Sequence, residues 1–90
     1  MILEIPLKKA PNQTLSVTIE NNVYDLELNM RLDELYLSVI KNNQPLVYNR
    51  VCQDLNPIRG GFYFNDVEGV SDPKWDGLGD RFKLIWTSDI

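Results

Sequence analysis

The residues with the most chemical potential in this sequence are five carboxylates in its C-terminal third, Asp66, Glu68, Asp72, Asp76 and Asp80. Carboxylate oxygens are the ligands that Ca²⁺ prefers. The spacing of these side chains does not match the calcium-binding helix-loop-helix pattern, and the glycines nearby do not stand where that pattern places its turn glycine. We therefore expect no metal site here.

Other catalytic patterns are incomplete. The sequence has no His, which removes the usual general base near neutral pH and the commonest metal ligand. The neighbouring carboxylates Asp33 and Glu34 could serve glycoside hydrolysis only in an apolar cleft, which a domain of this size is not expected to hold. The pairs Gly60-Gly61 and Gly77-x-Gly79 lack the patterns that cradle phosphate. We expect neither an enzyme nor a cofactor.

Composition points to one compact domain over residues 1–90, because 90 residues with 43% hydrophobic and 24% charged side chains suit a single core. A net charge of -4 and scattered basic residues argue against nucleic-acid binding. Glu4 and Pro6 interrupt the apolar start, which predicts neither a signal peptide nor a membrane span. The single Cys52 favours a small buried apolar residue over a disulfide or a reactive thiol.

Hydrophobic side chains recur with a period of two, separated by turn residues at regular intervals, and helical periodicity is nowhere sustained. This pattern predicts an all-β fold, a small antiparallel barrel or sandwich of six or seven strands. The predicted strands cover residues 2–7, 13–20, 23–31, 34–41, 46–52, 61–64 and 81–87.

Tight turns link the middle strands into a meander. The Asn21-Asn22 pair suits a two-residue turn with positive φ at both positions. Leu32-Asp33 and the cluster 42–45 provide two further tight links. Strand 34–41 carries apolar side chains on both faces, which predicts either a central strand or a strand covered by a partner.

A long connection follows at residues 65–79, and long ordered loops in compact domains are commonly functional. Ser71 or Asp72 is predicted to cap a single helical turn over residues 73–77, with Pro73 at its first position. Trp75 is then expected to fold back onto the end of the β domain.

Two segments of the chain are the most specific, Pro-Asn-Gln-Thr-x-Ser-Val at 11–17 and Asp-Pro-x-Trp-Asp-x-Leu-Gly at 72–79. Shorter characteristic segments occupy residues 5–7, 24–26, 36–39, 44–47 and 80–81. Together these segments, over nearly the whole chain, resemble the small baseplate plug family of contractile-tailed bacteriophages.

This resemblance implies a non-enzymatic virion protein in the centre of the tail baseplate, made in the host cytoplasm. It would contact the hub and spike and help to plug the tail tube before contraction. By analogy with tail symmetry, three or six copies could surround the axis. The candidate protein-interface residues are Tyr36, Tyr48, Tyr63, Asp72, Trp75, Asp76, Leu78 and Arg81.

Two alternatives remain open at this level. The aromatic candidates could instead fill the core, because a domain of this size needs aromatic side chains in its interior. The function could be that of a tail assembly factor or a generic protein-binding β module. The first strand, with Pro6 inside it and charges around it, resembles a protected sheet edge, which favours partner contacts through side chains over strand addition.

Overall fold

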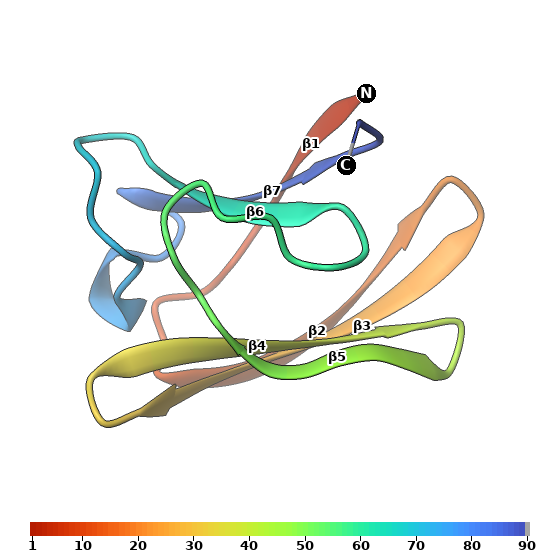
Figure 1. The fold of residues 1–90 in the computed structure, drawn as a ribbon, viewed down its shortest axis with the longest axis horizontal. Coiled ribbons are helices and arrows are strands. Elements are labelled where there is room, and N and C mark those ends of the chain that lie inside the picture. Colours follow the sequence, from red (N-terminus) through yellow and green to blue (C-terminus); the bar gives the residue numbers. More distant parts are fainter. Residues whose placement is uncertain (90) are drawn as a thin grey trace.

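The computed structural model describes residues 1–89, and over these residues the chain forms two antiparallel sheets that pack face to face (Figure 1). A three-stranded sheet has the order β1-β7-β6, and a four-stranded sheet has the order β2-β3-β4-β5. The strands are β1 (Ile2–Ile5), β2 (Asn12–Ile19), β3 (Asn22–Arg31), β4 (Glu34–Lys41), β5 (Gln44–Val51), β6 (Phe62–Asp66) and β7 (Phe82–Thr87).

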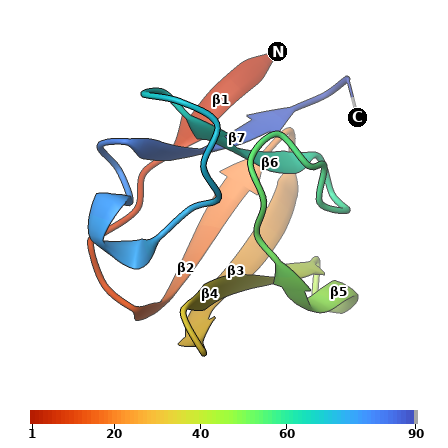
Figure 2. The ribbon, with the colours of Figure 1, turned by 60° about the vertical axis from the view of Figure 1, so that its left-hand side comes forward.

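The predicted all-β class and all seven strands are confirmed, with strand ends shifted by one or two residues. Of the two architectures predicted, the structure has the sandwich. The sheets do not close into a barrel, because no hydrogen-bonded ladder joins β1 or β6 to an edge of the four-stranded sheet (Figure 2).

The four-stranded sheet is the predicted meander, built by three successive two-residue turns. In the second turn, φ is 49° at Leu32 and 67° at Asp33. In the third turn, φ is 51° at Asn42 and 67° at Asn43. Positive φ at both central residues gives the turn a twist that matches the flanking strands. The first turn differs from the prediction by one residue, because Ile19 pairs with Asn22 and the turn residues are therefore Glu20 and Asn21.

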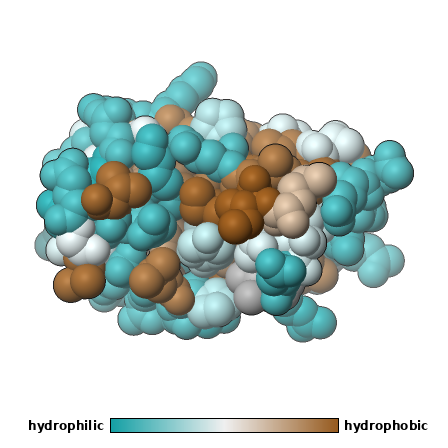
Figure 3. Space-filling model, turned by 90° about the horizontal axis from the view of Figure 1, so that it is seen from above, coloured by the Kyte–Doolittle hydropathy of each residue, from teal (hydrophilic) through white to brown (hydrophobic). Residues whose placement is uncertain are grey.

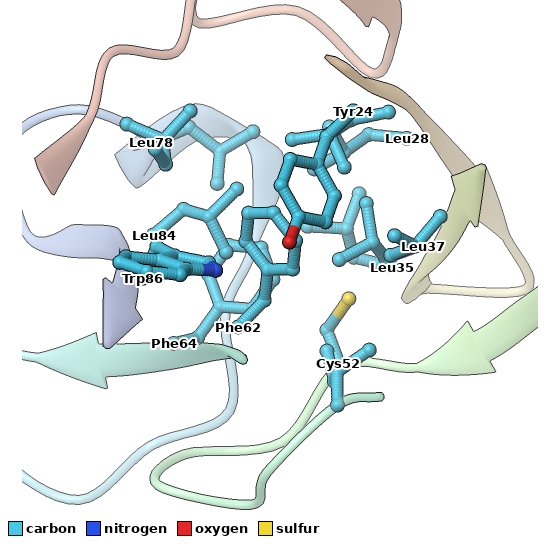
Figure 4. Close-up of a cluster of buried hydrophobic side chains, with 14 of the residues drawn as sticks. Tyr24, Leu28, Leu35, Leu37, Cys52, Phe62, Phe64, Leu78, Leu84 and Trp86 are labelled. Atoms are coloured by element: carbon cyan, nitrogen blue, oxygen red, sulfur yellow. The ribbon is translucent and has the colours of Figure 1, made fainter. Parts of the chain in front are cut away.

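The core lies between the two sheets and is lined by the alternating inward side chains of both (Figure 4). Tyr24 of β3 meets Phe62 of β6 edge to face, with 5.3 Å between ring centroids, so an aromatic pair joins the sheets. The buried hydrophobic residues are Ile5, Ile19, Tyr24, Leu26, Leu28, Leu35, Leu37, Val39, Cys52, Ile58, Phe62, Phe64, Leu78, Phe82, Leu84 and Trp86.

Cys52 is buried in this core, as predicted, and its thiol lies among apolar side chains (Figure 4). Burial raises the pKa of the Cys52 thiol to about 12, since the thiolate would lose its hydration. The side chain therefore remains a neutral thiol at physiological pH, and its role is packing.

Strand β4 is central, because β3 and β5 flank it on either side. Its inner residues Leu35, Leu37 and Val39 are buried, while Tyr36 and Ile40 on the other face are half-buried. The prediction of a central strand is thus confirmed.

The predicted helical turn is a short 3₁₀ helix, η1 (Trp75–Gly77). The predicted cap is wrong, because Lys74 occupies the N-cap position and no side chain caps the helix. Trp75 remains 37% exposed, so the domain covers the larger part of this residue while one part stays accessible. Pro73 and Leu78, on either side of η1, are the residues that enter the core.

Candidate protein interface

The loop between β6 and β7 is organised by a single buried carboxylate, Asp66, at the end of β6. The Nε and Nη2 atoms of Arg81 each donate a hydrogen bond of 2.8 Å to its two oxygens. The backbone N–H groups of Glu68 and Ser71 donate two more, at 2.9 and 2.8 Å. The Asp66 side chain has no exposed surface. Four donors thus satisfy this carboxylate and fold the loop around it.

These donors also set the charge state of Asp66. The hydrogen bonds from Arg81 hold the pKa of the Asp66 carboxyl well below its usual range, with help from the Ser71 and Glu68 amides and against the effect of burial. The same contact raises the pKa of Arg81. Asp66 is therefore ionised in the folded protein at any pH above the acid range.

This arrangement predicts a loss of stability in acid. A carboxyl whose pKa is depressed by folding binds fewer protons folded than unfolded, so its stabilising effect is present above the unfolded pKa of about 3.9 and is lost as the pH falls below it. We expect a melting temperature that is nearly constant between about pH 5 and 7 and falls below about pH 4. Thermal melts across this range test it. The same acid slope in an Asp66→Ala variant would contradict it.

Three further hydrogen bonds fix the loop to the rest of the domain. The Asp54 side chain accepts from the Asp66 N–H at 2.8 Å, and the Asp54 N–H donates to the Asp72 side chain at 3.0 Å. At the other end of the loop, the Lys74 ammonium donates to the backbone oxygen of Asp33 at 2.7 Å. The η1 segment is thus held against the turn between β3 and β4.

One end of the molecule carries several exposed apolar side chains, and we call it the loop end. It is formed by η1, the 67–70 segment and the β3–β4 turn, which gather at the left of Figure 1. Figure 3 shows brown side chains set among teal ones at this end. Shallow depressions flank η1, with Asp72 and Lys74 among the lining residues. The exposed apolar residues of the loop end are Leu32, Val67, Val70 and Trp75.

Leu32 is the most unusual residue of the loop end. It is 98% exposed and has a φ of 49°. A left-handed conformation disfavours residues with a Cβ, and Asn, Asp or Gly are the ordinary residues at such a turn. In the isolated chain, Leu32 is therefore stabilised neither by burial of its side chain nor by its backbone conformation. A binding role would account for its presence.

We expect Leu32→Asn to stabilise the isolated protein by about 1 kcal/mol, because Asn adopts the left-handed region at lower cost. Chemical denaturation measures this change in the free energy of unfolding. Leu32→Ala is the matched control: it also removes the exposed side chain but keeps an ordinary Cβ at positive φ, and so is not expected to stabilise. Equal stability of all three proteins would contradict the prediction.

The structure gathers some of the predicted interface residues and separates others. Asp72, Trp75 and Asp76 lie exposed at the loop end. Leu78 is 1% exposed and belongs to the core. Arg81 is held by Asp66, but its side chain remains 38% exposed and lines the depression beside η1 together with Asp72.

The three tyrosines do not form one surface. Tyr36 lies on the outer face of the four-stranded sheet, where its hydroxyl donates to Glu34, and Tyr48 is exposed on β5. Tyr63 lies on the outer face of the three-stranded sheet.

Sequence reasoning missed an apolar patch on the outer face of the three-stranded sheet. Ile85 of β7 pairs with Tyr63 on one side and with Glu4 of β1 on the other. Ile2, also on β1, is 66% exposed. Brown surface gathers over this sheet in the middle of Figure 3. The alternation of β7 carried the signal, because Ile85 falls between the buried Leu84 and Trp86 and so faces outward.

Within residues 1–89 the structure holds no group of three or more acidic or Cys side chains placed to bind a metal ion. The described residues also contain no helix long and apolar enough to cross a membrane. Exposed apolar and aromatic side chains form two sets on the surface, one at the loop end and one on the three-stranded sheet.

These features define a small all-β domain with exposed apolar and aromatic side chains at the loop end and on the three-stranded sheet. A family model described as cyanophage baseplate Pam3 plug gp18 matches residues 2–89. The chain belongs to this family of phage baseplate plug proteins, which confirms the resemblance found in the sequence. It is therefore a structural protein of the phage tail baseplate that interacts with other baseplate proteins.

Proposed function

We propose that this protein occupies the centre of the tail baseplate, contacts the hub and spike through the loop end, and helps to plug the tail tube before contraction. In this role it performs no catalysis. It is made in the host cytoplasm and joins the virion during tail assembly, in three or six copies around the tail axis.

The observation that carries this proposal is the construction of the loop end. Leu32 lies on the β3–β4 turn and Trp75 on η1, which the Lys74 contact joins, and the pairing of buried Asp66 with Arg81 holds the loop that carries η1. Rigidly held apolar and aromatic side chains bind partners at low entropic cost. A plug needs such a contact, because it must stay attached until contraction breaks its contacts together.

Quantitative mass spectrometry of purified, intact tails tests this function. We expect the chain at a fixed low ratio to the hub protein, retained after stringent washing. Its absence from finished tails would overturn the proposal and favour an assembly factor that acts during tail building and is then lost.

A comparison of tails before and after contraction tests the plugging of the tube separately from the presence of the chain in the tail. We expect cryo-electron microscopy to show density for the chain across the tube axis before contraction and none there afterwards. Density away from the axis in both states would retain the structural role but contradict the plug.

A further inference from the structure

The free edge of β2 presents an unpaired row of backbone groups. Because the turn at Glu20–Asn21 contains two residues, Ile19 and Asn22 form a hydrogen-bonded pair, and hydrogen-bonded and non-hydrogen-bonded pairs alternate along the ladder. The N–H and C=O groups of Thr14, Ser16 and Thr18 therefore point away from β3. Within residues 1–89 no backbone or side-chain group is hydrogen-bonded to them.

The other edge of the same sheet, β5, is protected against the addition of a further strand. Pro45 stands next to the turn, where its missing N–H faces outward. The pairing with β4 shifts register twice, and Asn49 has a φ of 49°. These irregularities prevent a partner strand from forming a regular ladder along β5.

Both edges of the three-stranded sheet are also protected against strand addition. Residues Asp54 and Ile58 form bridges with Phe64 and Phe62, so the preceding loop covers β6. Strand β1 is an edge strand of only four residues, and Pro6 lies just after it and not inside it as predicted; the short length limits the edge that β1 offers.

Strand β2 carries none of these protections. It runs for eight residues, Asn12–Ile19, without a charge, a proline or a register shift. Natural proteins rarely leave such an edge open, since any extended chain can pair with it. In a protein that works within an assembly, an open edge indicates a place where a partner strand is added.

The surroundings of β2 define the chemistry of that strand. On the inner face, Leu15 and Val17 are half-exposed at the end of the core, so an added strand would cover them with apolar side chains. On the outer face, Ser16 pairs with Asp25 and Thr14 with Glu27, which places two carboxylates one strand behind the edge. The added strand should therefore alternate apolar residues with polar or basic ones.

We infer that β2 receives an extended strand of another baseplate protein by antiparallel or parallel β-augmentation, with apolar side chains inward and Lys, Arg or Thr side chains outward. A second copy of this chain fits less well, because its β2 would bring only uncharged side chains to the outer face beside Asp25 and Glu27. The inference rests on the proposed incorporation of the chain into the tail, but not on its plugging of the tube.

Hydrogen–deuterium exchange, read by mass spectrometry with residue-level fragmentation, tests this inference on wild-type protein. In the free protein we expect fast exchange at the amides of Thr14, Ser16 and Thr18 and slow exchange at those of Leu15 and Val17. In purified tails we expect the three fast amides to slow by at least about a hundred-fold, as in a regular ladder.

Fast exchange at these amides in tails that contain the chain would overturn the inference while leaving the proposed function intact. A chain absent from tails would instead overturn the proposed function itself. Slow exchange already present in a free dimer would place a second copy on β2, and would also overturn the inference.

A matched pair of variants tests the same edge genetically. Ser16→Pro removes one outward N–H in a position that an edge strand tolerates, whereas Ser16→Ala keeps that N–H; both lose the hydroxyl that donates to Asp25. We expect at least a ten-fold drop in tail incorporation for Ser16→Pro relative to Ser16→Ala, provided that both melt cooperatively. Equal incorporation of the two variants would overturn the inference, and a Ser16→Pro chain that does not fold leaves the exchange measurement to decide.

Discussion

Replacing Asp66 with Ala is expected to lower the melting temperature by about 10 °C, since the buried carboxylate accepts four hydrogen bonds that no other group replaces, although the partly exposed Arg81 can regain water. Arg81 would lose two hydrogen bonds, and the amides of Glu68 and Ser71 would lose one each. Thermal unfolding followed by circular dichroism measures the effect.

The matched control is Asp80→Ala, which removes a carboxylate of the same loop that pairs with Lys9 at the surface. An exposed ion pair contributes little, so we expect a change of no more than a few degrees. If the two variants melted alike, the Asp66 cluster would not be the device that holds the loop.

Much of the fold was predictable because it depends on local signals. Alternating apolar residues identify each strand and its inner face, and the tight turns at 32–33 and 42–43 fix the register of the meander. The first turn was misplaced by one residue because Glu20, which carries no turn signal, adopts a φ of 51°. The choice of a sandwich over a barrel could not be predicted, since it depends on which distant edges pair.

The site was less predictable for the same reason. The specific motif at 72–79 located the loop that forms much of the exposed end, but not the direction of its side chains. Trp75 was expected to fold onto the end of the domain and is only 37% exposed, whereas Leu78, expected at the interface, is buried in the core. The pairing of Asp66 with Arg81 depends on the ends of β6 and β7 meeting in the sheet. No spacing rule in the sequence signals that contact.

Trp75 is a partly exposed side chain on a rigidly held segment, so its removal tests the attachment of this protein to the tail directly. We expect Trp75→Ala to reduce incorporation into tails by about 30-fold or more, equivalent to a loss of about 2 kcal/mol in binding. Because Trp75 is only 37% exposed, we expect the substitution also to lower the free energy of unfolding by about 2 kcal/mol, which leaves most small domains folded.

A competition experiment separates attachment from folding. Cells that produce variant and wild-type chains together supply both to the same assembling tails, and mass spectrometry compares their ratio in purified tails with the ratio in the soluble pool. Leu55→Ala is the control, since it removes an exposed apolar side chain outside the loop end. If Trp75→Ala and Leu55→Ala entered tails equally well, the loop end would not be the attachment surface. If Trp75→Ala unfolded instead, the indole would have a larger structural role than its partial burial indicates.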